Sequence, residues 1–437
     1  MQHTTSDGAE PPPGVVTALC RRPLPARSPR GLRLWQARIA DTTAFGPWPA
    51  DPVASGCAWW DDAAARGAAV GEAVERYCAA LPPAGLRRVT ARELAAADGP
   101  RPLDLARCAL FAADRHAEPG FPFAPLREDL PLRWVRGRDL RTGHPRAVPV
   151  GLVYTTVHRA VDRRTYADEP VTGPLPCAGV AAATATADAV DNALLELVER
   201  DAVARTWDTG RPWTELHVPR TFRDACRAAG RAGSFDIRLF AVPAVVEVLV
   251  LAAVAADPVT GFVAAGSAAR HDAVHAALKA VAEACQLHLV LAELDDPDSA
   301  TMRQAAADPR SPLRPWRADR RYLDSYRRPG WRDVHDLACH LQLHLDPRMR
   351  ERFADRLPRR PRARLTDLGA APAAAGDALV RAGFEPTVVD VTTSDVRALG
   401  GTAVRVVVPG LRPNTPAAYP VSVGEAPSPG RVPLPYA

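Results

Sequence analysis

The sequence predicts an α/β (α+β) fold with mixed sheets, in which three related strand–loop–helix units supply the main helices. Three segments each place a glycine sixteen or seventeen residues before a glutamate on an Ala-rich helical pattern. Runs of β-branched and small apolar residues precede the second and third segments, as expected for strands. Strand, loop and glutamate-bearing helix thus recur in order along the chain.

The central segment, residues 179–202, is predicted to be a loop followed by a helix. Thr186 stands where an N-cap is expected, Asp188 falls in the first turn, and the residues after it are good helix formers without Gly or Pro. Glu196 and Glu199 are three residues apart, so both carboxylates point to one face of this helix. Neighbouring carboxylates repel each other unless water, arginine or a cation separates them.

The same arrangement occurs in three places, starting at Gly56, Gly179 and Gly266. A single ExxER pattern is common on a solvated helix face, where its charges form weak surface ion pairs. Three copies at matched spacing favour a shared site, in which the helices present a ladder of acids and one amide. The predicted ladder consists of Glu72, Glu75, Glu196, Glu199, Glu283 and Gln286, with Arg76 and Arg200 directly after two of the acids.

The remaining elements are predicted from local patterns. Residues 32–39 alternate as a strand does, and residues 148–157 are a β-branched run typical of a buried strand. Residues 245–255 and 261–265 flank a turn signal, which predicts a hairpin. Residues 100–147 are expected to be irregular. An α–β–α–β piece, expected at the edge of a larger sheet, spans residues 372–383, 387–391, 394–399 and 403–408.

A predicted helix at residues 331–345 carries Asp336, His340 and His344 at a spacing of four. These side chains would share one face, as metal ligands on a helix do. No further ligand is apparent nearby, so we favour a structural role over a metal site.

Composition excludes several classes of protein. The 437 residues are 47% hydrophobic and carry a net charge of +5, which gives little reason to expect a nucleic-acid partner. No apolar stretch is long enough to predict a membrane span. The eight cysteines are scattered without a CxxC pair, which predicts reduced thiols in a cytoplasmic protein and no zinc site built from cysteines.

The acid ladder indicates a magnesium–nucleotide site. Carboxylate oxygens are ligands for hard cations, and Mg²⁺ completes its shell with phosphate oxygens and water. Arg76 and Arg200 could pair with the acids or contact a phosphate. A P-loop and a kinase lysine motif are excluded, because the only lysine, Lys279, lies in an Ala-Leu-Lys-Ala sequence.

These segments resemble the motifs of the YcaO superfamily, ATP-dependent enzymes that activate backbone amides of ribosomally made peptides. Residues 71–77, GEAVERY, are similar to the end of the first motif, SxxxExxER. Residues 179–202 are similar to the second motif, and residues 266–286 to the third, GxxA…ExxQ. The resemblance covers roughly residues 30–415.

The resemblance implies a composite catalytic domain at residues 31–415, with a loosely held lead at residues 1–30 and a proline-rich tail at residues 416–437. It implies ATP and Mg²⁺ as cofactors. The implied metal ligands are Glu72, Glu75, Glu196, Glu199 and Glu283. The implied nucleotide-binding residues are Gly179, Asn192, Arg76, Arg200 and Gln286.

The tail ends in Pro-Leu-Pro-Tyr-Ala, which is similar to the Pro-x-Pro-x-Pro terminus of azoline-forming YcaO enzymes. The resemblance implies a catalytic role for Pro433, Pro435 and Ala437. We expect the tail to dock near the acid ladder. We also expect that deleting residues 433–437 lowers ring formation while leaving the melting temperature almost unchanged.

The implied reaction makes azoline rings. A Cys, Ser or Thr side chain attacks the preceding backbone carbonyl, ATP phosphorylates the oxyanion, and phosphate leaves. The implied partners are a ribosomal precursor peptide and a separate leader-peptide-binding protein, with no nucleic acid and no membrane; a homodimer is left open. Thioamide or macroamidine formation are alternatives. A non-catalytic scaffold is a further alternative, because Ala68, Ala178 and Ala183 stand where the family motifs have Ser, Asn and Gly.

Overall fold

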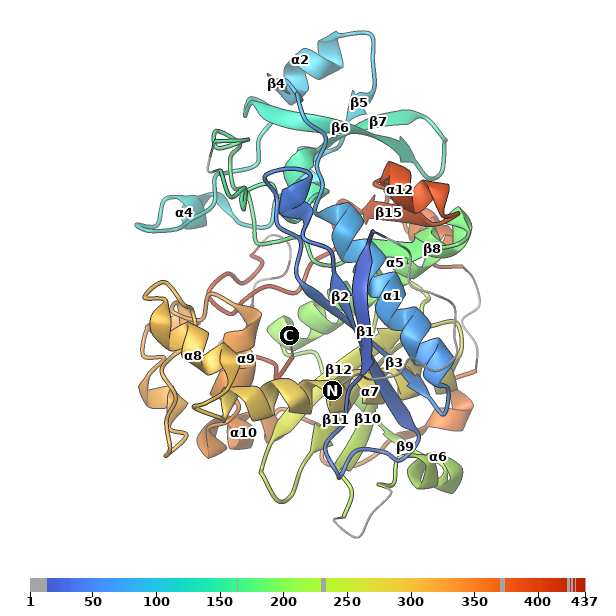
Figure 1. Ribbon diagram of the computed structural model, residues 1–437, viewed down its shortest axis with the longest axis vertical. Helices are drawn as coiled ribbons and strands as arrows, with labels where there is room; N and C mark the ends of the chain where they lie inside the picture. Colours follow the sequence, from blue (N-terminus) through green and yellow to red (C-terminus); the bar gives the residue numbers. More distant parts are fainter. Residues whose placement is uncertain are drawn as a thin grey trace.

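The computed structural model describes residues 14–162, 164–228, 233–369, 374–422, 425, 427–428 and 430–436 (Figure 1). Within this part of the chain the strands form three sheets, with helices between and around them. Two of the sheets contain both parallel and antiparallel pairs. The predicted mixed α/β class is therefore confirmed.

The first sheet is antiparallel and comes from the N-terminal part of the chain. Its strands are β1 (Val16–Arg21), β2 (Leu32–Ile39) and β3 (Val53–Trp59), in that order. Strand β2 has the bounds that the sequence predicts. Strand β1 lies inside the expected N-terminal lead and pairs with β2, while residues 1–13 of that lead lie outside the described residues.

The second sheet has the strand order β12-β11-β10-β9-β13. Strands β11 and β12 pair antiparallel across the turn at residues 257–261, where Gly261 N–H donates to the Asp257 carbonyl over 2.8 Å. The predicted hairpin is confirmed. The strands are β9 (Thr214–His217), β10 (Asp236–Ala241), β11 (Val250–Ala256), β12 (Val263–Ala269) and β13 (Ala363–Arg364).

The third sheet joins segments from across the chain, in the order β5-β7-β6-β14-β15-β8 with β4 beside β6. The C-terminal strands β14 and β15 thus lie inside this sheet, so their predicted position at an edge is wrong. The strands are β4 (Arg88–Val89), β5 (Arg101–Pro102), β6 (Leu132–Asp139), β7 (Pro145–Pro149), β8 (Val180–Ala183), β14 (Thr387–Asp390) and β15 (Thr402–Val407).

The hairpin of β6 and β7 corrects the expectation that residues 100–147 are irregular. Buried and exposed residues alternate over 135–139 of β6, but this is hidden in the sequence because two of the buried positions are Gly137 and Asp139. A Cβ on Gly137 would lie 3.0 Å from the Val388 carbonyl oxygen of β14, so the sheet packs closely there. The strand expected at residues 148–157 ends at Pro149 and continues as a 3₁₀ turn at Val150–Leu152.

The glutamate-bearing helices are α1 (Asp62–Ala79), α5 (Thr186–Thr209) and α7 (Ala273–Leu294). Each follows an edge strand of a different sheet: β3, β8 and β12 respectively. Helix α7 is long and apolar enough to cross a bilayer by length and composition, as the core helix of a soluble fold also is. It packs against β11 and β12, and half of its most apolar window is buried.

Shorter helices complete the described fold. Helices α11 and α12 correspond to those predicted near the C-terminus, although residues 372–373 of the first predicted helix lie outside the described residues. The short helices are α2 (Ala91–Ala96), α3 (Leu105–Cys108), α4 (Ala113–His116), α6 (Arg220–Ala225), α8 (Ala300–Ala307), α9 (Leu337–Leu343), α10 (Pro347–Ala354), α11 (Ala375–Arg381) and α12 (Ser394–Ala398).

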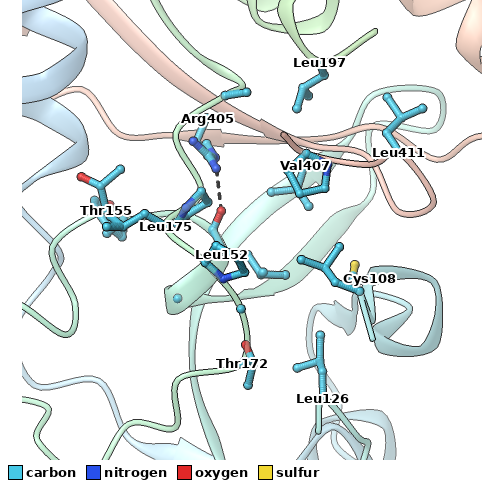
Figure 2. Close-up of a pocket in the computed structure, with 18 of the residues that line it drawn as sticks. Cys108, Leu126, Leu152, Thr155, Thr172, Leu175, Leu197, Arg405, Val407 and Leu411 are labelled. Atoms are coloured by element: carbon cyan, nitrogen blue, oxygen red, sulfur yellow. Dashed lines mark hydrogen bonds between the residues drawn. The ribbon is translucent and has the colours of Figure 1, made fainter. Parts of the chain in front are cut away.

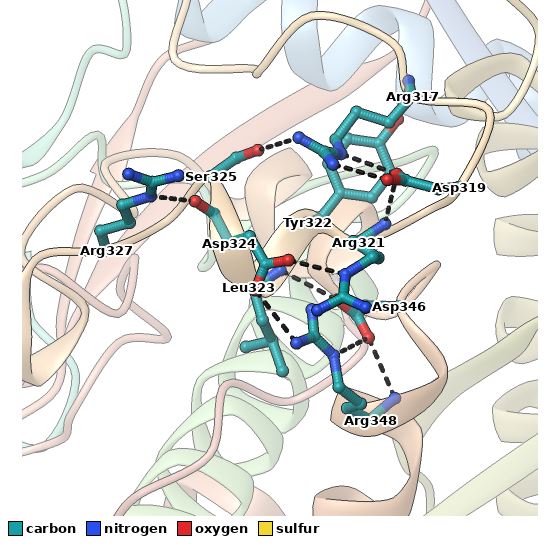
Figure 3. Close-up of polar contacts among 10 residues, drawn as sticks. All are labelled: Arg317, Asp319, Arg321, Tyr322, Leu323, Asp324, Ser325, Arg327, Asp346 and Arg348. Carbon is teal, nitrogen blue, oxygen red and sulfur yellow. Dashed lines mark hydrogen bonds and ion pairs between the residues drawn. The ribbon is translucent and has the colours of Figure 1, made fainter.

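A polar network orders the chain around α10 (Figure 3). Asp346 caps this helix and is fully buried, and its carboxylate accepts hydrogen bonds from the Leu323 N–H at 3.0 Å and from Arg348 at 2.7 Å. Arg348 also pairs with Asp324 at 3.0 Å. A buried carboxylate is tolerated when it is paired and hydrogen-bonded, so these contacts allow the start of α10 to pack against the core.

Candidate active site

Two glycines let the glutamate-bearing helices approach their strands. A Cβ on Gly56 of β3 would lie 2.0 Å from the backbone nitrogen of Ala69 in α1. A Cβ on Gly266 of β12 would lie 2.4 Å from the Ala280 carbonyl oxygen of α7. Only glycine fits at such contacts, so these two positions let α1 and α7, which carry Glu75 and Glu283, pack closely on β3 and β12.

Glu75 of α1 lies close to acids of its own helix and of α5. Burial raises the pKa of Glu75 well above its usual value, and the charges of Glu72 and Glu196 raise it further. The Ala182 N–H of β8 donates to Glu75 over 3.0 Å and opposes this shift. Helices α1 and α5 therefore bring acids together, as the sequence predicts.

Glu196 of α5 is held by the loop before β8. Gly179 has a φ of +88°, a conformation that favours glycine, and its N–H donates to the Glu196 carboxylate over 2.9 Å. Arg200 lies one turn further along α5, 3.6 Å from the same carboxylate. Burial still raises the pKa of Glu196 to about 6, with Glu199 and Glu72 adding to the shift.

Glu199 is 4% exposed and connects α5 to β12. Its carboxylate accepts hydrogen bonds from the Ser267 hydroxyl at 2.6 Å and from the Ala269 N–H at 3.2 Å, and it pairs with Arg200. Burial disfavours the charged Arg200 guanidinium, but Glu199 and Glu196 outweigh this effect and raise its pKa. Arg200 is therefore a fixed positive charge between two acids.

The third helix contributes a lysine pair and an amide. Lys279 lies 3.1 Å from Glu283, and this carboxylate raises the lysine pKa. The Gln286 carbonyl oxygen accepts a hydrogen bond from the Cys57 thiol of β3 at 3.3 Å, so Gln286 joins α7 to the first sheet. The charge of Lys279 also lowers the pKa of Glu75, so a cation on α7 acts on an acid of α1.

The outer residues of the predicted site are more exposed. Glu72 pairs with Arg76 at 2.8 Å, and both side chains are more than a third exposed. Arg76 also reaches Asp51 at 3.4 Å. Asn192 is exposed on α5, one turn before Glu196.

The donor set fits a hard divalent cation. All the acids offer oxygen ligands, and the raised pKa values of Glu75 and Glu196 mean that added positive charge would stabilise their ionised forms. In the described part of the chain, however, no cluster of three His, Cys, Asp or Glu side chains is already arranged as metal ligands. The acids are held instead by Arg76, Arg200, Lys279 and backbone N–H groups.

The C-terminal tail reaches this site. The Tyr436 hydroxyl lies 3.4 Å from a Glu199 carboxylate oxygen, and the Arg200 guanidinium lies over the tyrosine ring, 4.9 Å from its centre. The Pro435 carbonyl accepts a hydrogen bond from the Ala265 N–H of β12 at 2.7 Å. Ala437 lies outside the described residues.

His340 and His344 hold the tail rather than a metal. The Ala417 N–H donates to His340 Nε2, so His340 is the Nδ1–H tautomer and donates to the Leu434 carbonyl at 3.2 Å. His344 Nε2 donates to the Pro433 carbonyl at 2.8 Å. Asp336 is the N-cap of the shorter helix α9. The favoured structural role is thus borne out, but the partner segment could not be seen in the sequence.

Residues 60–412 match the sequence profile described as YcaO cyclodehydratase, ATP- and Mg²⁺-binding. The chain belongs to the YcaO family. The resemblance to YcaO proteins is therefore confirmed, and so are ATP and Mg²⁺ as the cofactors of the family domain. No curated protein sequence matches the chain.

Solved structures share the YcaO fold at low sequence identity. YcaO from Methanopyrus kandleri bound with AMPPCP and Mg²⁺ is 20% identical, with a TM-score of 0.55 over 96% of this chain and 91% of that one. A heterocyclase in complex with substrate and cofactor is 19% identical, with a TM-score of 0.60; the match covers 96% of this chain but only 55% of the heterocyclase. One chain of the E. coli microcin synthetase McbBCD complex is 15% identical, with a TM-score of 0.55; the match covers 90% of this chain and 87% of that one.

Proposed function

We propose that this YcaO protein uses ATP and Mg²⁺ to activate backbone amides of a ribosomally synthesised precursor peptide, and that it forms azoline rings from Cys, Ser or Thr. The observation that carries the proposal is the contact between the tail and the acid ladder at Tyr436 and Glu199. The proposal includes a separate leader-peptide-binding partner. The eight free cysteines support a cytoplasmic location.

Each part of the site has a role in this proposal. Glu72, Glu75, Glu196, Glu199 and Glu283 would hold Mg²⁺. Arg200 stays protonated between its acids and would contact a phosphate oxygen. When bound, ATP supplies the phosphoryl group that turns the amide oxygen into a leaving group, and Mg²⁺ offsets the phosphate charge.

The tail would position the peptide beside the acids. The two histidines and β12 hydrogen-bond to its backbone carbonyls, so the segment with Pro433 and Pro435 is already ordered where it approaches Glu199. A segment that is ordered before substrate binds loses little entropy when it acts. This role is the feature that favours azoline formation over thioamide or macroamidine formation.

Mass spectrometry tests the reaction. The chain, a neighbouring precursor peptide, its leader-binding partner, ATP and Mg²⁺ should together give a mass loss of one water per ring. Glu199→Gln should abolish the loss while leaving nucleotide-free folding intact. A gain that corresponds to sulfur replacing oxygen would select thioamide formation, and no change with any neighbouring precursor would refute the enzyme assignment.

A non-catalytic scaffold is the second candidate, and one observation favours it. Arg200 and Lys279 already occupy positions beside the acids, as counter-ions would in a purely structural cluster. Titration calorimetry with ATP and Mg²⁺ distinguishes the two functions. Saturable binding that is lost in Glu199→Gln supports the enzyme, and absence of binding supports the scaffold.

A further inference from the structure

A cavity of about 330 Å³ lies beside strand β15 (Figure 2). It lies among strand β15, the turn at Val150–Leu152, the loop at residues 171–178 and the short helix α3. Its walls are mostly apolar, with Leu126, Leu197 and Val407 among them. None of the ladder acids lines this cavity.

Two buried arginines, Arg405 and Arg412, line the cavity, and Arg412 donates to the Glu425 carbonyl at 2.9 Å. Arg405 of β15 is 3% exposed, and its Nε–H donates to the Leu152 carbonyl at 3.2 Å. Among the residues that the structure describes, the Arg405 Nη1 group has no hydrogen-bond partner. Burial lowers the pKa of Arg405 to about 10, against the opposing charge of Glu196, so the group remains positive at neutral pH.

Such a group is costly without an anion. Buried charges in proteins are usually paired, because removing an unpaired charge from water carries a large penalty. Guanidinium groups bind carboxylate and phosphate oxygens through parallel N–H donors. The apolar walls offer little to a strongly hydrated ion, so they favour a ligand whose remaining atoms are apolar or aromatic.

Arg405 connects this cavity to the acid ladder. On the paired strands β15 and β8, Arg405 lies opposite Val180, which follows Gly179, and the Gly179 N–H donates to Glu196. An anion on Arg405 would therefore sit beside the acids without using any of them as ligands.

We propose that this cavity is a binding site for a molecule that carries one anionic group, a carboxylate or a phosphate, on an apolar or aromatic body, with Arg405 Nη1 donating to the anion. A nucleoside phosphate and an apolar amino acid or peptide carboxylate share this chemistry. The proposed site is separate from the acid ladder, because none of the ladder acids lines the cavity, and we expect its occupation to need neither Mg²⁺ nor a precursor peptide.

A pair of fluorescent probes tests the proposal on the full chain without Mg²⁺. The anion 1-anilinonaphthalene-8-sulfonate should bind saturably, and Arg405→Met should weaken it by about tenfold or more, as expected for a hydrogen bond to a charged group. N-phenyl-1-naphthylamine, the same body without the anion, should bind both proteins equally. Arg159→Met is the matched control, since Arg159 also lines the cavity but is 47% exposed, and it should change neither affinity.

A second variant keeps the test decisive if Arg405→Met fails to fold. Thr172→Trp would fill the cavity from the lining loop and should remove binding of both probes. Displacement of the sulfonate by adenosine monophosphate identifies a nucleotide ligand, and displacement by N-acetyl-leucine identifies a carboxylate ligand. Sulfonate binding that is unaffected by Arg405→Met and Thr172→Trp, or that neither competitor displaces, would overturn the proposal.

Discussion

Truncating the C-terminal tail should destabilise the protein as well as stop ring formation. Removing residues 434–437 takes away Leu434 and Tyr436, which are 8% and 5% exposed in the main hydrophobic core. Full burial of an apolar side chain contributes about 1.5–3 kcal/mol, so the loss is about 3–6 kcal/mol as an upper estimate. The sequence alone predicts an unchanged melting temperature, and the burial of these two side chains reverses that prediction.

Equilibrium denaturation in guanidinium measures this effect, with Tyr436→Phe as the matched control. The control keeps the buried ring and removes only the hydroxyl, which is 3.4 Å from both Glu199 and Ser267. Because these contacts are long, its free energy of unfolding should change by less than about 1 kcal/mol. Ring formation should nevertheless fall if the hydroxyl positions Glu199. A truncated protein with the wild-type denaturation midpoint would show that the tail does not pack on the core in solution.

Three further results are expected. Burial lowers the pKa of His340 to about 3 and that of His344 to about 4 in the folded protein, against a usual 6.5. The free energy of unfolding is therefore highest above pH 6.5 and is lower by about 2 kcal/mol per histidine at pH 5. Between pH 7.5 and 5.0, His344→Gln should lose about 2 kcal/mol less of this free energy than the wild-type protein, and an equal loss would contradict this. Gly266→Ala should lower the free energy of unfolding by about 1–3 kcal/mol through overpacking, whereas Gly71→Ala, where a Cβ meets nothing within 4 Å, should raise it by about 0.5–1 kcal/mol; similar shifts in both would refute the close packing of β12 on α7. Glu75→Gln should remove Mg²⁺–nucleotide binding in calorimetry without lowering the melting temperature, since an amide oxygen can still accept from Ala182, and a loss of folding would identify Glu75 as a structural charge instead.

The parts of the fold that the sequence predicts are those governed by local chemistry. Strand β2 and the β11–β12 hairpin follow from alternation and a turn signal within about 20 residues. The glutamate-bearing helices follow from propensity and spacing. Strand β6 is not predicted by the sequence, because Gly137 and Asp139 occupy buried positions and suit them only through contacts with β14 and Arg146.

The same distinction applies to the site. Spacing predicts which helices carry the acids, because residues three apart share a face whatever the tertiary fold. It does not predict the partners that come from other elements, such as Ser267 for Glu199 or Ala182 for Glu75. The histidine pair shows the limit clearly: its i, i+4 spacing is visible, but its acceptors lie about 90 residues away in the tail.

The acids at the site suit a cation, but Arg200 and Lys279 already occupy positions beside them. Arg200 and Lys279 stabilise the acids in the absence of cofactor, yet the pKa of Glu196 stays raised at about 6 and burial keeps that of Glu75 well above its usual value. The protein's own cations therefore offset only part of the cost of burying these carboxylates. A divalent ion would offset the rest of this burial cost, and Arg200 would then be free to leave Glu199 and contact a phosphate. Because Tyr436 contacts both of these residues, the tail is placed to respond to that exchange.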